Sequence, residues 1–235
     1  RPPVLLDRSA TLAVAVESVG EAAAAGAKLI VLPETFIPGY PYWAMLLPPT
    51  ATSPYLRASY QQAVTVPSPA TDALCAAAKQ AGVHVVMGLC ERDGGTLYNS
   101  QLFIGPDGAR LACRRKLVPT VHERMVWVRG DGRDHAVLDT SLGKLGGLIC
   151  YEHSNALFRY ALQAQGEQLH IAQWPGGMPG IHSIIDAATR HYAFEAQAFV
   201  ISVTSVLTPE LLATLDAALR NRLKPGGGYT AIIAP

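Results

Sequence analysis

The sequence lacks an excess of charge of either sign. Its 235 residues carry 19 lysines and arginines against 18 aspartates and glutamates, so the formal net charge is +1 at pH 7. Such a balance gives no broad field to attract nucleic acid or anionic lipid. Long apolar runs are missing too, because none approaches the roughly 20 residues of a membrane-spanning helix. We therefore expect neither a nucleic-acid partner nor a membrane partner.

Cysteine is scarce, and its spacing matches no known motif. The chain has four cysteines, and no CxxC or CxxH pair links them, which argues against a zinc or redox motif. A secreted disulfide scaffold is not expected at this length and cysteine density. The opening stretch RPPVLLDRSA also lacks the apolar core of a signal peptide. These features predict a reducing, cytoplasmic setting with free thiols, buried by default at Cys75, Cys90 and Cys113.

The remaining metal and cofactor patterns are absent or incomplete. His182 and His191 are nine residues apart in one predicted helix, so they face roughly opposite sides. The glycine-rich KPGGGY has neither the strand–loop–helix order nor the Lys-Ser/Thr ending of a phosphate-binding loop. The basic run Arg114–Lys116 is typical of a solvated edge. We expect no metal and no cofactor.

Helix and strand signals alternate along the chain. Hydrophobic residues make up 49 % of the sequence, enough for a full core. Residues 36–43 and 117–134 read as loops, and 96–116 as a hairpin turning at Pro106-Asp107-Gly108. Helical spacing and caps predict helices over 10–25, 53–64, 69–82, 156–166, 181–197 and 209–223. Strands are expected within 28–34, 83–91, 135–152, 167–175, 198–206 and 227–235. The pattern predicts one α/β domain over residues 1–235.

Three reactive side chains follow predicted strands. Glu34 comes after KLIVLP, Lys116 after RLACRR, and Cys150 after LGGLI. Functional groups of α/β proteins gather at the carboxyl ends of strands. A cysteine thiolate is a nucleophile, a carboxylate can move protons, and an ammonium can stabilise developing negative charge. Spacing alone leaves the ordinary alternatives open, namely a buried thiol, a helix cap or solvated carboxylate, and a surface lysine.

Longer motifs around these residues add a family resemblance. The stretches LPETFIPGYPYW, RRKLVPTVHERMVW and LGGLICYEHSNALFRYALQAQGEQLHIAQWPGG resemble the nitrilase branch of the carbon–nitrogen hydrolase superfamily, in the family's order. The resemblance implies a four-layer αββα sandwich. It also implies that Cys150 is the nucleophile, Glu34 the general base, Lys116 the third member of the triad and Glu123 a second carboxylate beside the lysine. Tyr151 stands where the family usually has tryptophan.

The resemblance further implies a small-molecule nitrile as substrate and association into a homodimer or larger oligomer through surface helices. The chain lacks the first strand and the C-terminal strands and tail of that family, and we expect it to be a piece of a longer protein. Rival functions are a cyanide dihydratase, an amidase or N-carbamoyl hydrolase, and a non-catalytic assembly or binding protein. Candidate substrate-binding residues are Tyr42, Tyr151, His153 and Trp174. For the aromatic residues, packing in the core or between subunits is the alternative, and for His153 hydrogen-bonding scaffolding.

Overall fold

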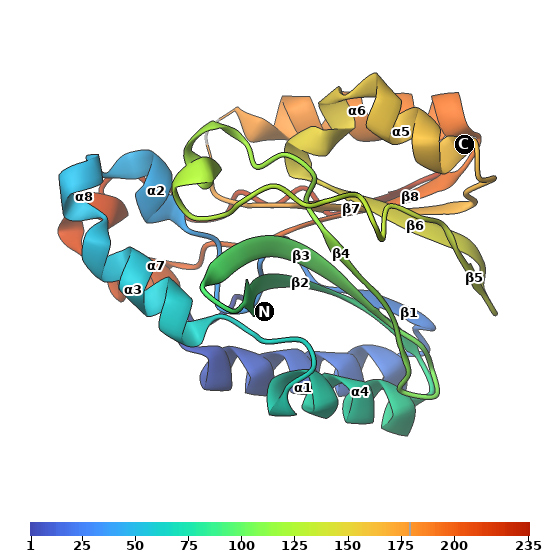
Figure 1. The fold of residues 1–235 in the computed structure, drawn as a ribbon, viewed down its shortest axis with the longest axis horizontal. Helices are drawn as coiled ribbons and strands as arrows, with labels where there is room; N and C mark the ends of the chain where they lie inside the picture. The colour runs from blue at the N-terminus through green and yellow to red at the C-terminus, as the bar shows by residue number, and fades with distance from the viewer. Residues whose placement is uncertain (179) are drawn as a thin grey trace.

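The strands of the computed structural model, which describes residues 1–178 and 180–235, form two sheets stacked on each other (Figure 1). The first sheet has the order β1-β2-β3-β4, with the bounds Leu29–Val31, His84–Asp93, Thr96–Ile104 and Arg110–Arg115. The second has the order β5-β6-β7-β8-β9, with the bounds Leu138–Thr140, Gly143–Ile149, Leu169–Trp174, Phe199–Thr204 and Ala231–Ile233. An apolar layer that includes Val86, Phe103, Leu145 and Ile171 holds the sheets together.

Two helices cover the outer face of each sheet. Helices α1 (Arg8–Ala24) and α4 (Pro69–Ala81) lie below β1–β4 in Figure 1, whereas α5 (Ala156–Gln163) and α6 (Ile181–Ala196) lie above β5–β9. Helix α1 buries Thr11, Ala15 and Val19, which share one helical face. The layers are therefore helix, sheet, sheet, helix, and the αββα prediction is confirmed.

Local sequence signals located several elements correctly. Helix α4 begins with a capping box at Ser68 and ends at Gly82 in the left-handed conformation, as predicted. Strands β3 and β4 form the hairpin that was expected to turn at residues 106–108. Cys75 and Cys90 are buried as predicted, but Cys113 is half-buried, and all four thiols are free. Among the described helices, none is long and apolar enough to cross a membrane.

Two predictions at one end of the sandwich were wrong. The expected loop over 36–43 runs into a short helix, α2 (Tyr42–Leu46). The expected helix over 209–223 is divided into α7 (Pro209–Ala213) and α8 (Ala217–Arg220). The second helix begins after Asp216, whose backbone carbonyl oxygen accepts the N–H groups of Leu219 and Arg220. The break lets side chains of both helices pack into one apolar cluster with the aromatic residues of α2, a long-range effect that helical spacing does not encode.

The remaining helical elements are one helix and three short 3₁₀ turns. They are α3 (Ser53–Gln62) and the 3₁₀ turns η1 (Pro49–Ala51), η2 (Val121–Met125) and η3 (Cys150–Ser154). Strands β6, β7 and β8 are parallel, with Ile149 beside Gln173 and Trp174 beside Thr204. Their carboxyl ends therefore share one edge of the second sheet, and η3 begins at that edge.

Candidate active site

Cys150 begins the turn η3 directly after β6. Its φ is +52°, in the left-handed region that a non-glycine residue rarely adopts and that costs of order 1–3 kcal/mol. Such a conformation persists only where surrounding contacts hold it. The thiol is buried, with 7 % of the residue exposed. A sharp turn at the end of a stiff strand thus presents the sulfur at the sheet edge.

Glu34 lies in a turn that follows β1 and presses against β2. A Cβ atom at Gly88 of β2 would lie 2.0 Å from the Pro33 carbonyl oxygen and 2.9 Å from the Glu34 Cα. Only glycine therefore allows the turn this close to the strand. The Glu34 Oε1 atom accepts hydrogen bonds from Asn99 Nδ2 at 2.7 Å and Lys116 Nζ at 3.0 Å. Its Oε2 atom has no hydrogen-bond partner within the described chain.

Lys116 follows β4 and lies between two carboxylates. Its Nζ atom donates to Glu34 at 3.0 Å and to Glu123 Oε2 at 2.8 Å. Glu123, in η2, also accepts the Thr120 backbone N–H at 2.7 Å and the Tyr40 hydroxyl at 2.8 Å. These bonds fix both carboxylates around the buried ammonium group.

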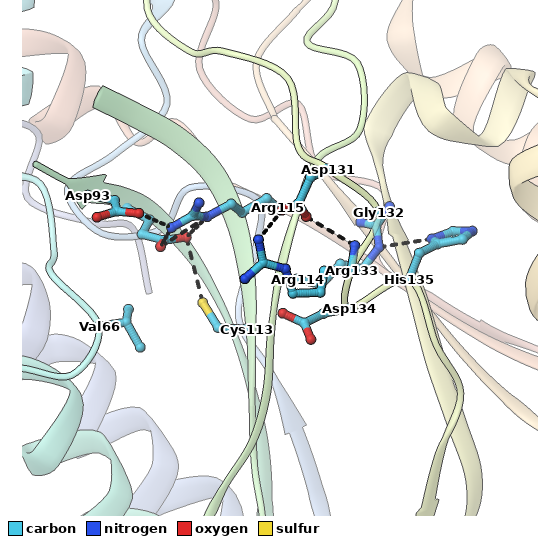
Figure 2. A pocket seen from close by; sticks show the side chains of 11 residues that line it. Val66, Asp93, Cys113, Arg114, Arg115, Asp131, Gly132, Arg133, Asp134 and His135 are labelled. Carbon is cyan, nitrogen blue, oxygen red and sulfur yellow. Dashed lines mark hydrogen bonds and ion pairs between the residues drawn. The ribbon is translucent and has the colours of Figure 1, made fainter. Parts of the chain in front are cut away.

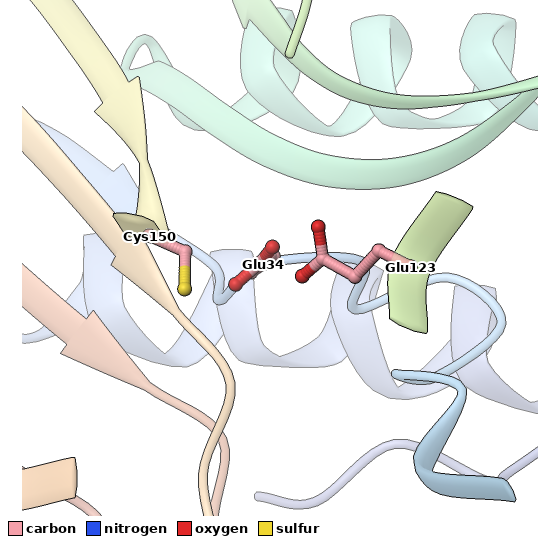
Figure 3. A group of neighbouring side chains, drawn as sticks. All are labelled: Glu34, Glu123 and Cys150. Atoms are coloured by element: carbon pink, nitrogen blue, oxygen red, sulfur yellow. The ribbon is translucent and has the colours of Figure 1, made fainter. Parts of the chain in front are cut away.

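The four residues that the sequence singled out converge on one point. Figure 3 shows the side chains of Cys150, Glu34 and Glu123 directed toward one another from three separate segments. The sulfur of Cys150 and one carboxylate oxygen each of Glu34 and Glu123 all lie within 4.8 Å of one another. Lys116 joins the two carboxylates, so nucleophile, proton acceptor and cation are all within reach of one reacting group.

Burial sets the protonation of this cluster. Loss of solvent raises the pKa of Glu34 to about 7, although Lys116 lowers it in part. Burial lowers the pKa of Lys116, but the charges of Glu34 and Glu123 outweigh it and keep the ammonium protonated. A carboxyl group with a pKa near neutral can both accept and return a proton.

The Cys150 thiol needs a base at neutral pH. Burial, and after it the charge of Glu34, raises the pKa of Cys150 well above its usual range. Lys116 and a hydrogen bond from the Tyr151 backbone N–H act in the opposite direction. The arrangement favours transfer of the thiol proton to Glu34 as the sulfur attacks, rather than a resting thiolate.

The same cluster does not suit a metal ion. Glu34, Glu123 and Cys150 have the spacing of a possible ligand set. The ammonium of Lys116 already bonds to both carboxylates. A bound cation would meet that buried positive charge, so these residues fit an organic reacting group better than a metal.

A buried ion pair joins the end of β4 to the end of β6. Arg114 Nη2 lies 2.7 Å from both carboxylate oxygens of Glu152. Glu152 also accepts the backbone N–H of Leu117 at 2.7 Å and of Ile149 at 2.8 Å. It thus ties the residue after Lys116, at the end of one sheet, to the residue before Cys150, in the other.

The expectation of a solvated basic edge was therefore wrong. Arg114 and Lys116 are buried. Only Arg115 is partly exposed, where it pairs with Asp93 at 2.9 Å and covers the Tyr98 ring. Successive side chains of a strand point to opposite faces, so Arg114 and Lys116 point into the protein and Arg115 points to the opposite face of the sheet. Carboxylates at a sequence separation of 38 and 82 residues compensate the two buried charges.

The candidate substrate-binding residues lie at different depths. Tyr42 and Trp174 are buried, and neither the Tyr42 hydroxyl nor the Trp174 Nε1 has a hydrogen-bond partner among the described residues. Burial and the charge of Glu34 raise the pKa of Tyr42, which lies near the cluster. Tyr151 is 55 % exposed and lines a cavity of about 260 Å³ with residues of the segment 118–124 and Phe158. His153 is buried and stacks on Trp174 with 4.7 Å between ring centroids.

Asn99 and Tyr40 have contacts that the sequence analysis did not assign. Asn99, in the middle of β3, donates to Glu34, and Tyr40 donates to Glu123. Tyr40 lies in the stretch 36–43, which the sequence predicts to be a loop. No local pattern identifies either contact, because both join residues more than 60 positions apart.

Another hollow lies on the first sheet beside Arg115 (Figure 2). Its volume is about 270 Å³, and it is lined by charged side chains of β4 and of the loop 131–135. Asp93 pairs with Arg115, and Asp131 with Arg133 at 2.7 Å. The hollow includes Cys113 but none of the four converging residues. It has mixed charge, and its thiol, Cys113, lies 3.8 Å from a Glu91 carboxylate that Arg115 already binds.

The fold and the converging residues together fit a hydrolase that uses a cysteine as its nucleophile. The chain belongs to the carbon-nitrogen hydrolase family, whose profile matches residues 1–235. Its chemistry is therefore hydrolysis of carbon–nitrogen bonds other than peptide bonds.

Relatives and solved structures agree with this assignment. A nitrilase from Paraburkholderia phymatum is 41 % identical over 100 % of the chain and 68 % of its own length. An aliphatic nitrilase from Rhodococcus rhodochrous is 40 % identical over 99 % of the chain and 66 % of its own length. The chain thus spans about two thirds of these relatives.

Among solved structures, a variant amidase from Nesterenkonia sp. AN1, with acrylamide added to its active-site cysteine, has a TM-score of 0.76 at 18 % identity. The match covers 100 % of this chain and 83 % of that one. A carbon-nitrogen hydrolase from Helicobacter pylori G27 has a TM-score of 0.74 at 17 % identity over 97 % and 77 %. At these identities the structures support the fold.

Proposed function

We propose that the enzyme hydrolyses an organic nitrile to the carboxylic acid and ammonia. The observation that carries the proposal is the buried group in which the Cys150 thiol faces Glu34 while Lys116 bridges Glu34 and Glu123. Relatives named nitrilases, about 40 % identical over the whole chain, favour a nitrile among carbon–nitrogen substrates. In this proposal the four residues have the roles that the family resemblance implied.

The reaction begins with addition to the nitrile carbon. Glu34 accepts the thiol proton as the Cys150 sulfur forms the new bond, and it then gives this proton to the nitrile nitrogen. Lys116 and the backbone N–H of Tyr151 stabilise negative charge on that nitrogen. The product is a thioimidate on Cys150. Glu123 positions Lys116 through their hydrogen bond of 2.8 Å.

Two water molecules complete the reaction. The first adds to the thioimidate carbon with Glu34 as general base, and ammonia leaves after protonation, so that a thioester remains. The second hydrolyses the thioester, releasing the acid and restoring the thiol. If the tetrahedral intermediate expels sulfur instead of ammonia, the product is the amide.

The test is release of ammonia from a panel of aliphatic, aromatic and arylacetic nitriles, their amides, and cyanide. We expect turnover of at least one organic nitrile and its loss in Cys150→Ala. Cys75→Ala, which removes a buried thiol of helix α4, is the matched control and should remain active. Release from amides alone would reassign the enzyme as an amidase, and release from cyanide alone would indicate a cyanide dihydratase.

We also propose that the enzyme forms a homo-oligomer through α5 and α6. These helices carry exposed apolar side chains at Leu157 (76 %), Tyr160 (67 %) and Phe194 (74 %). Both lie on the outer surface of the second sheet (Figure 1), and an apolar surface of this kind is typical of subunit contacts. Light scattering should show a dimer or larger, and Leu157→Glu combined with Phe194→Glu should shift it toward monomer. A monomeric parent protein would contradict the proposal.

A further inference from the structure

A chain of buried polar side chains ends on the backbone of Cys150. The His153 Nδ1 atom lies 2.7 Å from the Cys150 carbonyl oxygen. The Nε2 atoms of His153 and His170 are 2.9 Å apart, and His170 Nδ1 lies 2.9 Å from Glu167 Oε1. Tyr192 donates its hydroxyl to the other oxygen of Glu167. All of these side chains are buried, and the mechanism above uses none of them.

The chemistry of these contacts fixes the tautomers. A carbonyl oxygen can only accept, so His153 Nδ1 carries a hydrogen. Burial and the neighbouring His170 lower the pKa of His153 well below its usual range and keep its ring neutral. Its Nε2 atom is then bare and accepts the Nε2 hydrogen of His170. Both ring nitrogens of His153 are therefore occupied within the protein, and neither is available to a substrate.

At the other end of this series of side chains, His170 Nδ1 and both carboxylate oxygens of Glu167 also have hydrogen-bond partners. His170 Nδ1 shares its hydrogen bond with Glu167 Oε1, and Glu167 Oε2 accepts the Tyr192 hydroxyl. The ring of His170 stacks on Tyr192 with 3.7 Å between centroids. The hydrogen bonds thus run in one direction, from Glu167 and His170 through His153 to the carbonyl.

The carbonyl of Cys150 and the N–H of Tyr151 belong to one planar peptide group. In a trans peptide they point in opposite directions, so a hydrogen bond that holds the carbonyl also directs the N–H. That N–H lowers the pKa of the Cys150 thiol, and in the proposed reaction it stabilises the developing anion. A hydrogen bond to the carbonyl also polarises the amide and strengthens it as a donor.

We propose that His153, His170 and Glu167 form a positioning chain that anchors this peptide group and aims the Tyr151 N–H at the reacting atoms. The inference rests on the proposed function, because it takes Cys150 as the nucleophile. It assigns His153 to the protein interior, in place of the substrate contact that was one expectation from sequence. The left-handed φ of Cys150 supplies the reason for an anchor, since such a turn must be held from outside.

The variants separate hydrogen bonding from packing. His153→Phe keeps a ring against Trp174 but removes the donor to the carbonyl, and we expect kcat to fall about 10- to 100-fold with KM within about threefold. Glu167→Gln can still donate to His170 Nδ1 and accept from Tyr192, so it should stay within about threefold of the parent. Glu167→Leu has no such groups and should lose about tenfold or more in kcat.

A spectroscopic measurement on the parent protein tests the chain without any substrate. Nitrogen-15 NMR of the histidines should show His153 protonated at Nδ1 and bare at Nε2. The opposite tautomer, or a fully active His153→Phe, would overturn the proposal. Equal losses in Glu167→Gln and Glu167→Leu would do so too. If the parent protein released no ammonia from any nitrile, the proposed function would fail, whereas the tautomer and the alkylation rate of Cys150 in these variants would still test the anchor.

Discussion

The Nζ atom of Lys116 lies 3.0 Å from Oε1 of Glu34, and neither side chain is exposed to solvent. The distance joins the end of β4 to the turn after β1, in a region where an unpaired charge would be costly. In the proposed reaction, the ammonium of Lys116 is therefore part of the environment of the base, Glu34, and also stabilises the substrate anion.

The pH dependence of activity should report the ionisation of Glu34. Burial raises its pKa to about 7 from a usual value of 4.5, and only the ionised form can accept the thiol proton. The logarithm of kcat/KM should therefore rise with pH below about 7 and level off above it. The sign for stability is opposite, because the folded state binds this proton more tightly than the unfolded chain. The contribution of Glu34 to stability should fall as pH rises between these two values. An acidic limb near pH 4 would contradict the assignment of Glu34 as base.

Replacement of Lys116 by methionine should remove catalysis and disturb the base. We expect kcat to fall by about 10²- to 10³-fold, the typical loss for one group that stabilises a developing anion. The pKa of Glu34 should also rise, because the positive charge that lowers it is gone. The matched control is Lys144→Met, at an exposed lysine outside the site, which should leave kcat unchanged. A Lys116→Met enzyme with more than a tenth of parental kcat would exclude the proposed role.

The Arg114–Glu152 pair should show strong coupling in unfolding experiments. Arg114→Met alone leaves a buried carboxylate without its cation, and Glu152→Leu alone leaves a buried guanidinium, each at a cost of about 3–5 kcal/mol. The double variant should lose clearly less than the sum. It should still be less stable than the parent, because the Leu117 and Ile149 N–H groups lose their acceptor. Urea unfolding of the four proteins measures the coupling, and additive losses would show that the pair is not a unit.

Gly88→Ala should impair activity from a position outside the cluster. The added methyl would overlap the Pro33 carbonyl oxygen, so the turn that carries Glu34 must move. We expect kcat to fall about 10- to 100-fold through displacement of the base. Gly20→Ala is the control, since nothing lies within 4 Å of its added methyl and the change favours helix formation. Equal activity of both variants would contradict the close packing of this turn.

Local sequence signals were sufficient for much of this account. Caps and spacing located α4, strand ends located Glu34, Lys116 and Cys150, and the longer motifs predicted the αββα layers and Glu123. What they missed depends on distant partners. Nothing near Arg114 indicates that a carboxylate 38 residues later lets it lie buried, and nothing near residue 214 indicates the break between α7 and α8. His153 followed the nucleophile in sequence and so suggested the pocket. Its role depends on His170, which the fold brings to it from β7.

The most direct test of the central claim is to trap the intermediate on Cys150. The enzyme is mixed with a nitrile that it hydrolyses, quenched in acid within the turnover time, and digested for mass spectrometry. The account predicts the mass of the substrate's acyl or imidoyl group on the peptide that contains Cys150, and on none that contains Cys75, Cys90 or Cys113. Ammonia release at an undiminished rate from Cys150→Ala, with no adduct on the parent peptide, would show that the nucleophile lies elsewhere.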